Sequence, residues 1–289
     1  MKPSSFNQPQ RTRRAQRKNA SSFTLFAPFA VKSLRLFTAI LFLLPVFWMI
    51  AASLHPRGVP LPQTLQLLPQ QPTLENYGRI FHLIPITRFT LNSLIVVATA
   101  VPLTLITSSW AGYSMSQLPR PSQRRLILLS LAILMVPGIA LWSTRFLIYK
   151  QLGWTGSLIA LIAPAFMGSS PFYVLMFYRA FRRIPHAIYD AARLDGAGVL
   201  QTWAAIALPI ARPTAVGVAL LSFILYWGDF TSPLLYLSSE KWYTLPIALQ
   251  LLQQMGRSDW PLLMAAAVIA TAVPTLLFLL LQPYFHKPQ

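Results

Sequence analysis

Long apolar runs alternate with short, polar and mostly basic segments along this chain of 289 residues. A helix needs about 20 apolar residues to cross a bilayer, and several of these runs reach or exceed that length. We therefore predict an all-α, polytopic membrane protein with six transmembrane helices. The predicted spans are residues 33–54, 88–117, 125–148, 157–181, 214–237 and 261–284.

The segments outside the spans differ in character. Residues 1–32 are basic and lack apolar periodicity, so we expect a disordered cytoplasmic tail, with binding to anionic lipid as the alternative role. The first run, 33–54, is too long for a signal-peptide core and is expected to remain as a span. Residues 55–87 form an extracytoplasmic loop, with a short helix across 74–82. Residues 88–285 make up the remaining transmembrane domain.

Six prolines fall inside the predicted spans, where they favour bent helices around a shared cavity, although ordinary irregularity of membrane helices fits equally well. They are Pro45, Pro102, Pro137, Pro164, Pro171 and Pro274.

The charge distribution supports this reading and orients the chain. Only 10% of residues are charged, against about 25% in a soluble domain, and the net charge is +18. A positive balance can indicate nucleic-acid binding, but here 17 of the 24 Lys and Arg residues fall in alternate connecting segments or the adjoining span ends, and 7 fall on the other side. Positive residues collect on the cytoplasmic side, so we expect a multi-pass protein of a bacterial-type inner membrane, with both termini cytoplasmic and no nucleic-acid partner.

Several kinds of chemistry are excluded or disfavoured. There are no cysteines, the four histidines are scattered, and no GxxxxGK[ST] phosphate-binding loop occurs. Apart from Asp229, the few acidic residues lie in loops on opposite sides of the membrane, which disfavours paired catalytic carboxylates. We expect no catalytic residue, no metal site and no cofactor bound by this chain, and hence no enzyme.

One segment, residues 184–213, is too polar to span a bilayer and too patterned to be a slack loop. It divides into two short helices at Asp195-Gly196, where Gly196 suits a left-handed helix end. Apolar residues recur after it at helical spacing, at Leu200, Trp203 and Ile206. The simplest interpretation is an interfacial helix pair that covers the bilayer edge.

The spacing within this segment supports a sharper interpretation. Asp190-Ala191-Ala192, then Gly196, then Ile206-x-Leu208-Pro209 resembles the EAA loop of binding-protein-dependent ABC importer permeases, with Asp190 in place of the usual Glu. Flanking motifs resemble the carbohydrate-type subfamily and its six-span second subunit. They are Asn92-Ser93-Leu94, Ala111-Gly112-Tyr113, Trp227-x-Asp229-Phe230, Pro233-Leu234, Thr244-Leu245-Pro246 and Leu281-Gln282-x-Tyr284-Phe285.

The resemblance implies a type I importer permease fold, in which segment 184–213 is a cytoplasmic coupling helix pair seated on a separate ATPase. It implies an ABC ATPase dimer that uses the ATP, a second permease subunit in a heterodimer, an extracytoplasmic solute-binding protein and membrane lipid as partners. Leu200 and Trp203 would provide the apolar knob, and Asp190 would pair with a basic residue of the ATPase. The coupling residues expected from the resemblance are Asp190, Ala191, Ala192, Asp195, Gly196, Leu200, Trp203, Ile206, Leu208 and Pro209.

A second group of residues is a candidate for the solute path. Asp229 lies near a span end beside Trp227 and Phe230, where aromatic faces can stack on sugar rings and a carboxylate can accept hydroxyl hydrogen bonds. A local capping or pairing role is the alternative for Asp229. Asn92 is equally open to a path role or to a hydrogen bond with a neighbouring helix.

The predicted function is ATP-driven import of a sugar by alternating access. One alternative is a permease for another solute, such as a phosphate ester, an amino acid or a polyamine. The other is a polytopic membrane enzyme that acts on a lipid-linked substrate, for which no catalytic cluster is visible.

Overall fold

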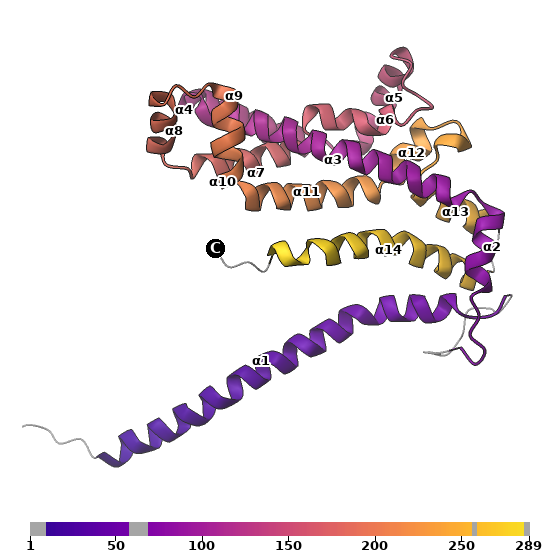
Figure 1. Cartoon of the computed structure of the whole chain (residues 1–289), viewed down its shortest axis with the longest axis horizontal. Helices are drawn as coiled ribbons and strands as arrows, with labels where there is room; N and C mark the ends of the chain where they lie inside the picture. The colour runs from indigo at the N-terminus through magenta and orange to yellow at the C-terminus, as the bar shows by residue number, and fades with distance from the viewer. Residues whose placement is uncertain (1–9, 58–68, 256–258, 286–289) are drawn as a thin grey trace, which may run out of the picture.

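The computed structural model describes residues 10–57, 69–255 and 259–285, with side chains described from residue 31 to residue 280 of these ranges. They form helices joined by short turns, and no strand occurs among them, which confirms the predicted all-α class. The elements, labelled in Figure 1, are α1 (Gln10–Ser53), α2 (Glu75–Leu83), α3 (Ile86–Gln117), α4 (Arg120–Met135), η1 (Gly138–Leu141), α5 (Trp142–Gln151), α6 (Ile159–Ile162), η2 (Ala163–Met167), α7 (Pro171–Arg182), α8 (His186–Leu194), α9 (Val199–Gln201), η3 (Thr202–Ala207), α10 (Leu208–Ile210), α11 (Arg212–Trp227), α12 (Thr231–Tyr236), η4 (Glu240–Trp242), α13 (Leu245–Met255) and α14 (Trp260–Phe285).

Four helical stretches of the described chain are long and apolar enough to cross a membrane, and the number reaches six if each of two bent pairs is one span. The four are Val31–Ser53, Ile86–Gln117, Ile159–Arg182 and Trp260–Leu280. The predicted six spans agree in number with the upper count, in which one bent pair joins Val199–Ile210 to Arg212–Trp227. Large apolar side chains on α1 remain exposed, including Phe42 at 76%, as expected of a helix surrounded by lipid or by another subunit.

The helices of the structure depart from two of the predicted spans. The predicted span 125–148 breaks by 87° after α4, because Pro137 and Gly138 follow Met135. The predicted span 214–237 ends early, since α11 stops at Trp227 and the chain restarts as α12.

The predicted span 157–181 is also interrupted. Gly168 and Ser169 have left-handed φ angles of 74° and 59°, and Pro171 then begins α7 with Ser170 as the N-cap. The chain therefore breaks beside Pro137, whereas Pro171 begins α7 after the break at Gly168 and Ser169, and Pro102 lies inside the continuous helix α3.

The expected disorder of residues 1–32 is also corrected for part of the segment. Helix α1 begins at Gln10, and its backbone is helical through the basic part of that segment. The physical reason is composition: Arg, Gln, Ala and Lys dominate its first half, and all four are favourable in helices. The short helix expected at 74–82 is confirmed by α2.

The helices lie side by side along one direction (Figure 1). Helix α3 packs along α7 and α11, whereas α1 packs on α14, and α14 also contacts α2 and α13. The described start of α1, the end of α14, the end of α7 and α8–α10 all lie toward the same end of the molecule, on the left in Figure 1. Helices α2, α5, α12 and α13 lie at the opposite end.

Gly112 sets the closest approach between α3 and α7. A Cβ at this position would lie 2.7 Å from the Phe177 Cβ and 2.8 Å from both the Tyr178 nitrogen and the Val174 carbonyl oxygen. Since real Cβ atoms essentially never come so close, the two backbones can be neighbours only because this residue is glycine.

Candidate functional site

The segment that follows α7 forms a compact prong at one end of the molecule (Figure 1). We use "the prong" for residues 186–210, which comprise α8, α9, the π-helical turn η3 and α10. It lies between two apolar helices, and Arg212 begins α11 directly after it. A second 83° bend separates it from α11, so the prong projects at a steep angle from that helix.

The turn at Gly196 has the geometry that the sequence predicts. Gly196 has a φ of +79°, its N–H donates to the Arg193 carbonyl (3.1 Å), and the Ala197 N–H donates to the Ala192 carbonyl (2.9 Å). These two bonds constitute a Schellman motif, which satisfies carbonyls at the end of α8. The motif fixes the angle between α8 and α9.

A matched pair of serine substitutions tests this turn. Gly196→Ser forces a side chain into the left-handed region at a cost of about 1–2 kcal/mol, whereas Gly198→Ser, at a φ of −69°, adds a helix-capping hydroxyl and should be neutral or slightly stabilising. We expect tryptic cleavage after Arg193 to rise about 5- to 30-fold in the first variant only, because cleavage of a transiently opened segment follows its open population. Equal cleavage of both variants would contradict the assigned role of Gly196.

One face of the prong is buried against the apolar helices. The Trp203 ring packs edge-on against Trp110 of α3 at a centroid distance of 5.2 Å, and Tyr189 packs against Tyr113 at 6.1 Å. Tyr113 in turn meets Phe181 of α7 at 5.7 Å. These five residues, which we call the aromatic base, tie the prong to α3 and α7.

The aromatic base corrects the expected role of Trp203. Its side chain is 9% exposed, and its indole Nε1 is buried without a hydrogen-bond partner among the described residues. It therefore faces inward and cannot project as a knob in this conformation. The reason is that Trp203 lies on the same helical face as Ala207, which is fully buried against the same cluster.

Tyr189 is held in its uncharged form within this base. Burial raises its pKa to about 12, and the neighbouring Tyr113 hydroxyl adds to the effect. Its protonated hydroxyl donates to the Phe181 carbonyl at 3.3 Å. The end of α7 and the start of the prong are thus joined by a neutral hydrogen bond in a low-dielectric setting.

The opposite face of the prong presents apolar side chains to the outside. Leu194 is 89% exposed, Val199 is 66% exposed and Leu200 is 63% exposed. They flank the Gly196 turn on both sides, and we call these three residues the tip. Leu200 is one of the two residues expected to form the apolar knob, whereas no sequence pattern indicates Leu194 and Val199, which fall outside the helical stripe.

The remaining predicted coupling residues lie around the tip. Asp190 and Arg193 form an exposed ion pair at 3.3 Å, so the carboxylate remains accessible to a further cation. The other positions divide into buried, half-buried and exposed groups. Ala192 is buried, Ile206 and Leu208 are half-buried, and Ala191, Asp195, Gly196 and Pro209 are exposed.

Asn92 forms structural hydrogen bonds in this conformation. Its side-chain amide is buried and donates to the backbone carbonyls of Lys241 and Tyr243, each at 2.9 Å. The adjacent Ser93 hydroxyl accepts from the Leu245 N–H at 2.9 Å. Two motifs that are separated by about 150 residues thereby clamp each other, which favours the hydrogen-bonding interpretation of Asn92 over a path role.

A comparison of two asparagines tests the clamp. Asn92→Ala leaves two part-buried carbonyls without their donor and should cost about 2 kcal/mol, with faster amide exchange over residues 241–245. Asn76→Ala removes an equivalent pair of bonds, to Ser53 and His55, and should instead accelerate exchange near residues 53–55. Hydrogen–deuterium exchange distinguishes the two patterns, and an unchanged rate at 241–245 in the first variant contradicts the clamp.

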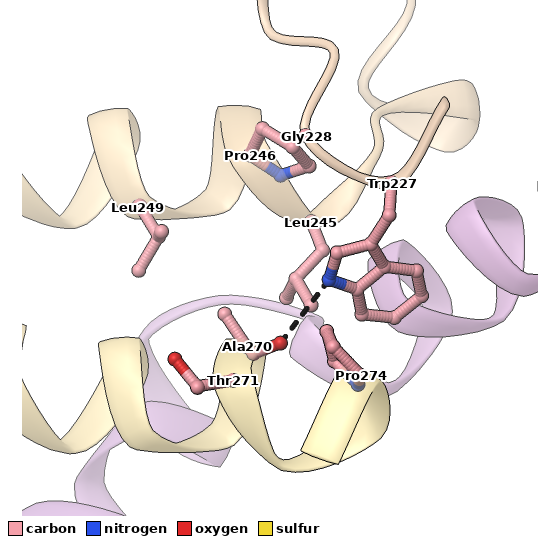
Figure 2. A pocket seen from close by; sticks show the side chains of 8 residues that line it. All are labelled: Trp227, Gly228, Leu245, Pro246, Leu249, Ala270, Thr271 and Pro274. Carbon is pink, nitrogen blue, oxygen red and sulfur yellow. Dashed lines mark hydrogen bonds between the residues drawn. The ribbon is translucent and has the colours of Figure 1, made fainter. Parts of the chain in front are cut away.

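Trp227, Asp229 and Phe230 are close in sequence but differ in their surroundings. The Trp227 indole is buried, stacks on Phe223 at 5.8 Å and donates to the Ala270 carbonyl at 3.2 Å (Figure 2). Asp229 is half-buried and accepts from the Ser232 N–H at 3.0 Å in the first turn of α12. This is the capping role that was the alternative for Asp229. Phe230, also half-buried, directly precedes α12.

A cavity of about 300 Å³ adjoins Trp227. Figure 2 shows the Trp227 indole on one side of the space and the Thr271 hydroxyl on the other side, below Leu249 of α13. This hydroxyl donates to the Ala267 carbonyl at 2.7 Å. The sequence did not indicate Thr271, because it lies in the middle of a strongly apolar run.

Besides Thr271, the sequence did not indicate a cluster of three hydroxyl groups that lies between the helices. Ser169 hydrogen-bonds with Thr104 of α3 and with the Tyr226 hydroxyl of α11, the latter at 2.7 Å. The three hydroxyls join three predicted spans at the break before α7. Serine, threonine and tyrosine are common in membrane helices, so this arrangement carries no recognisable sequence pattern.

No group of three or more His, Cys, Asp or Glu side chains that could hold a metal ion occurs among the described residues.

Comparison with known proteins decides the family. The model of the family described as "binding-protein-dependent transport system inner membrane component" matches residues 23–287. The chain belongs to this family. Members are transport components and not enzymes, so the alternative of a lipid-processing enzyme is excluded.

Curated relatives match over most of their length. The chain is 31% identical over 252 residues to the trehalose/maltose transport system permease protein MalG of Thermococcus litoralis, covering 85% of this chain and 89% of that protein. It is 30% identical over 278 residues to the diacetylchitobiose uptake system permease protein NgcG of Streptomyces coelicolor, covering 96% and 91%.

A solved structure shares the fold. A chain from a bacterial ABC transporter involved in the import of the acidic polysaccharide alginate superimposes with a TM-score of 0.71 at 20% sequence identity, over 92% of this chain and 98% of that one. The protein therefore has the type I ABC importer permease fold that the resemblance implies.

Proposed function

We propose that this permease imports a sugar or a related carbohydrate, and that the prong couples it to a separate ATPase. The carbohydrate assignment rests on the relatives: MalG is named for the transport of trehalose or maltose, and NgcG for the uptake of diacetylchitobiose. A sulfoquinovosyl glycerol permease protein of Agrobacterium fabrum is a further relative, at 28% identity over 267 residues. These solutes all carry glycosyl groups, whereas phosphate esters, amino acids and polyamines do not.

The observation that carries the coupling proposal is the two-sided construction of the prong. The tip leaves three large apolar side chains exposed at a turn, where water contact is unfavourable unless a partner covers them. The aromatic base fixes the other side of the prong to α3 and α7. A partner that moves the tip would thereby move the two helices that pack most closely at Gly112.

The partner we propose is a dimer of ABC ATPase subunits, which binds and hydrolyses the ATP. The chain itself binds no nucleotide. Closure of the ATPase dimer pushes the prong, and the helices respond by alternating access. Residues 190–209 provide the contact: Leu194, Val199 and Leu200 enter an apolar groove, and Asp190 pairs with a cation at its rim.

The remaining partners follow from the same proposal. A second permease subunit completes the pathway as a heterodimer, and a solute-binding protein delivers the sugar on the side of α2 and α13. The prong and both termini are cytoplasmic, since most basic residues fall in the segments at that end. The structure of an alginate transporter with a pentasaccharide-bound periplasmic protein has the same fold at a TM-score of 0.61 and 15% identity.

The cavity beside Trp227 is a stronger candidate for the solute path than the surroundings of Asn92. It is lined by the Trp227 indole on one side and, on the other, by the Thr271 hydroxyl, which donates to the Ala267 carbonyl and can still accept a hydrogen bond. Asp229 and Phe230 lie next to it in sequence, and the Asp229 carboxylate retains an acceptor oxygen beyond its bond to Ser232. Asn92 would contribute indirectly, by holding the loop that leads into α13.

The test is uptake by the assembled importer in proteoliposomes. Purified permease pair, ATPase and binding protein should accumulate a labelled di- or oligosaccharide only when ATP is present, and should exclude glycerol phosphate, amino acids and polyamines. ATP-dependent uptake of one of these other solutes, with no sugar uptake, would replace the carbohydrate assignment. The ATPase subunit should also co-purify with the permease after mild detergent extraction.

A further inference from the structure

Six arginines gather where α4 begins and α7 ends. Gln123 of α4 is buried and accepts a hydrogen bond from the Tyr178 hydroxyl of α7 at 2.8 Å, while its amide donates to the Ser116 and Leu118 carbonyls. This buried contact holds the two helix ends together. The exposed arginines around it are Arg120, Arg124, Arg125, Arg179, Arg182 and Arg183.

These arginines have little internal compensation. Helices α4 and α7 contain no Asp or Glu. The ion pairs of the described chain join Arg79 to Asp259 and Arg193 to Asp190, so none of them involves the six. Arg182 contacts the His186 ring at 3.4 Å, and an imidazole ring supplies no negative charge. The cluster therefore presents a concentrated positive field.

The position of the cluster along the helices determines what it meets. Arg124 and Arg125 lie one turn from Leu128 and Leu129, which share their face of α4 and are 57% and 56% exposed. Arg179 lies two turns from Phe172, which is 48% exposed on α7. The arginines thus lie one to two helical turns beyond exposed apolar side chains of the same helices.

We propose that this cluster, the arginine girdle of α4 and α7, binds the phosphate headgroups of anionic phospholipids. A guanidinium donates two parallel hydrogen bonds to phosphate oxygens, and all six residues are arginine, none lysine. Lipid acyl chains then lie along Leu128 and Leu129 while the headgroup meets Arg124 and Arg125. The inference rests on membrane insertion and not on the proposed coupling to an ATPase, so each can fail without the other.

Lipid binding to the purified full-length chain tests the proposal. Native mass spectrometry in detergent should show phosphatidylglycerol bound about tenfold more tightly than phosphatidylcholine with the same acyl chains. The variant Arg124→Gln/Arg125→Gln/Arg179→Gln should lose that preference. The control Arg57→Gln/Arg88→Gln/Lys150→Gln removes the same charge from exposed positions at the other end and should keep it.

Three results would overturn the proposal: no preference in the parent protein, an equal loss in the two triple variants, or retained lipid preference with lost ATPase binding in the first variant. The last result would assign the cluster to a protein partner. A photoactivatable phosphatidylglycerol, applied to the unaltered protein, provides a measurement that does not depend on folding of the variants. Cross-links in peptides from 120–135 and 171–183 support the girdle, and cross-links confined to other peptides contradict it.

Discussion

The double substitution Leu194→Asp/Leu200→Asp is expected to abolish association with the ATPase and all ATP-driven uptake, while the protein still folds and inserts. Both side chains are exposed, at 89% and 63%, so a carboxylate at either position costs the free permease little. In the complex, the same carboxylates would be buried in an apolar groove without partners, which costs several kcal/mol. A loss of at least about 2 kcal/mol, as at an interface hot spot, weakens binding about 30-fold.

Co-purification and uptake measure this effect, and Leu74→Asp provides the matched control. Leu74 is 71% exposed just before α2, at the opposite end of the molecule from the prong. The same chemical change there should leave ATPase association intact. If the double variant still binds the ATPase and transports, the tip is not the contact.

Gly112→Ala is expected to destabilise the permease by about 3 kcal/mol, a large effect for a single methyl group. The added Cβ would lie 2.7–2.8 Å from atoms of α7, and two of the three are backbone atoms that cannot move without shifting the helix. The change should lower the thermal unfolding temperature in detergent and the yield of monodisperse protein.

Gly217→Ala is the matched control, because it introduces the same methyl group on α11. Its Cβ would meet only the Met176 Cε, at 3.8 Å, an ordinary contact with the end of a flexible side chain. Alanine is also better than glycine inside a helix, by about 0.5–1 kcal/mol, so this variant should be unchanged or more stable. A Gly112→Ala protein as stable as Gly217→Ala would show that α3 and α7 do not pack as described.

The all-α class and the number of apolar spans could be predicted from the sequence, because membrane helices are recognised by the length and hydrophobicity of their apolar runs. The helix ends were harder to predict. Average hydropathy stays high through Met135 and through Trp227. Helix α4 nevertheless ends at Met135, just before Pro137 and Gly138. Helix α11 ends at Trp227, and α12 begins only at Thr231. The left-handed φ angles of Gly168 and Ser169, which interrupt the helix before α7, likewise cannot be read from hydropathy.

The prong likewise combines features that local sequence rules predict with features that they do not predict. The left-handed Gly196 and the two short helices follow from local rules, and both are present. The facing of Trp203 does not follow from them, since an apolar stripe can be covered either by the same chain or by a partner. Only the presence of Trp110 and Tyr113 on α3, about 90 residues earlier in the chain, places Trp203 inside and leaves Leu194, Val199 and Leu200 for the partner.

Asn92 illustrates a further limit. A polar side chain in an apolar run is equally consistent with a buried hydrogen bond and with a contact to the solute. The distinction depends on which carbonyls lie nearby, and those of Lys241 and Tyr243 come from a distant loop.

Site-directed cross-linking at the tip tests the coupling role of the prong most directly. The chain contains no cysteine, so Leu200→Cys and Trp203→Cys each carry a single attachment point for a photoactivatable maleimide. In the assembled importer, we predict that position 200 cross-links to the ATPase subunit, whereas position 203, which is 9% exposed in the native chain, does not. Cross-linking of position 200 to lipid alone, with the ATPase present and bound, would contradict the account.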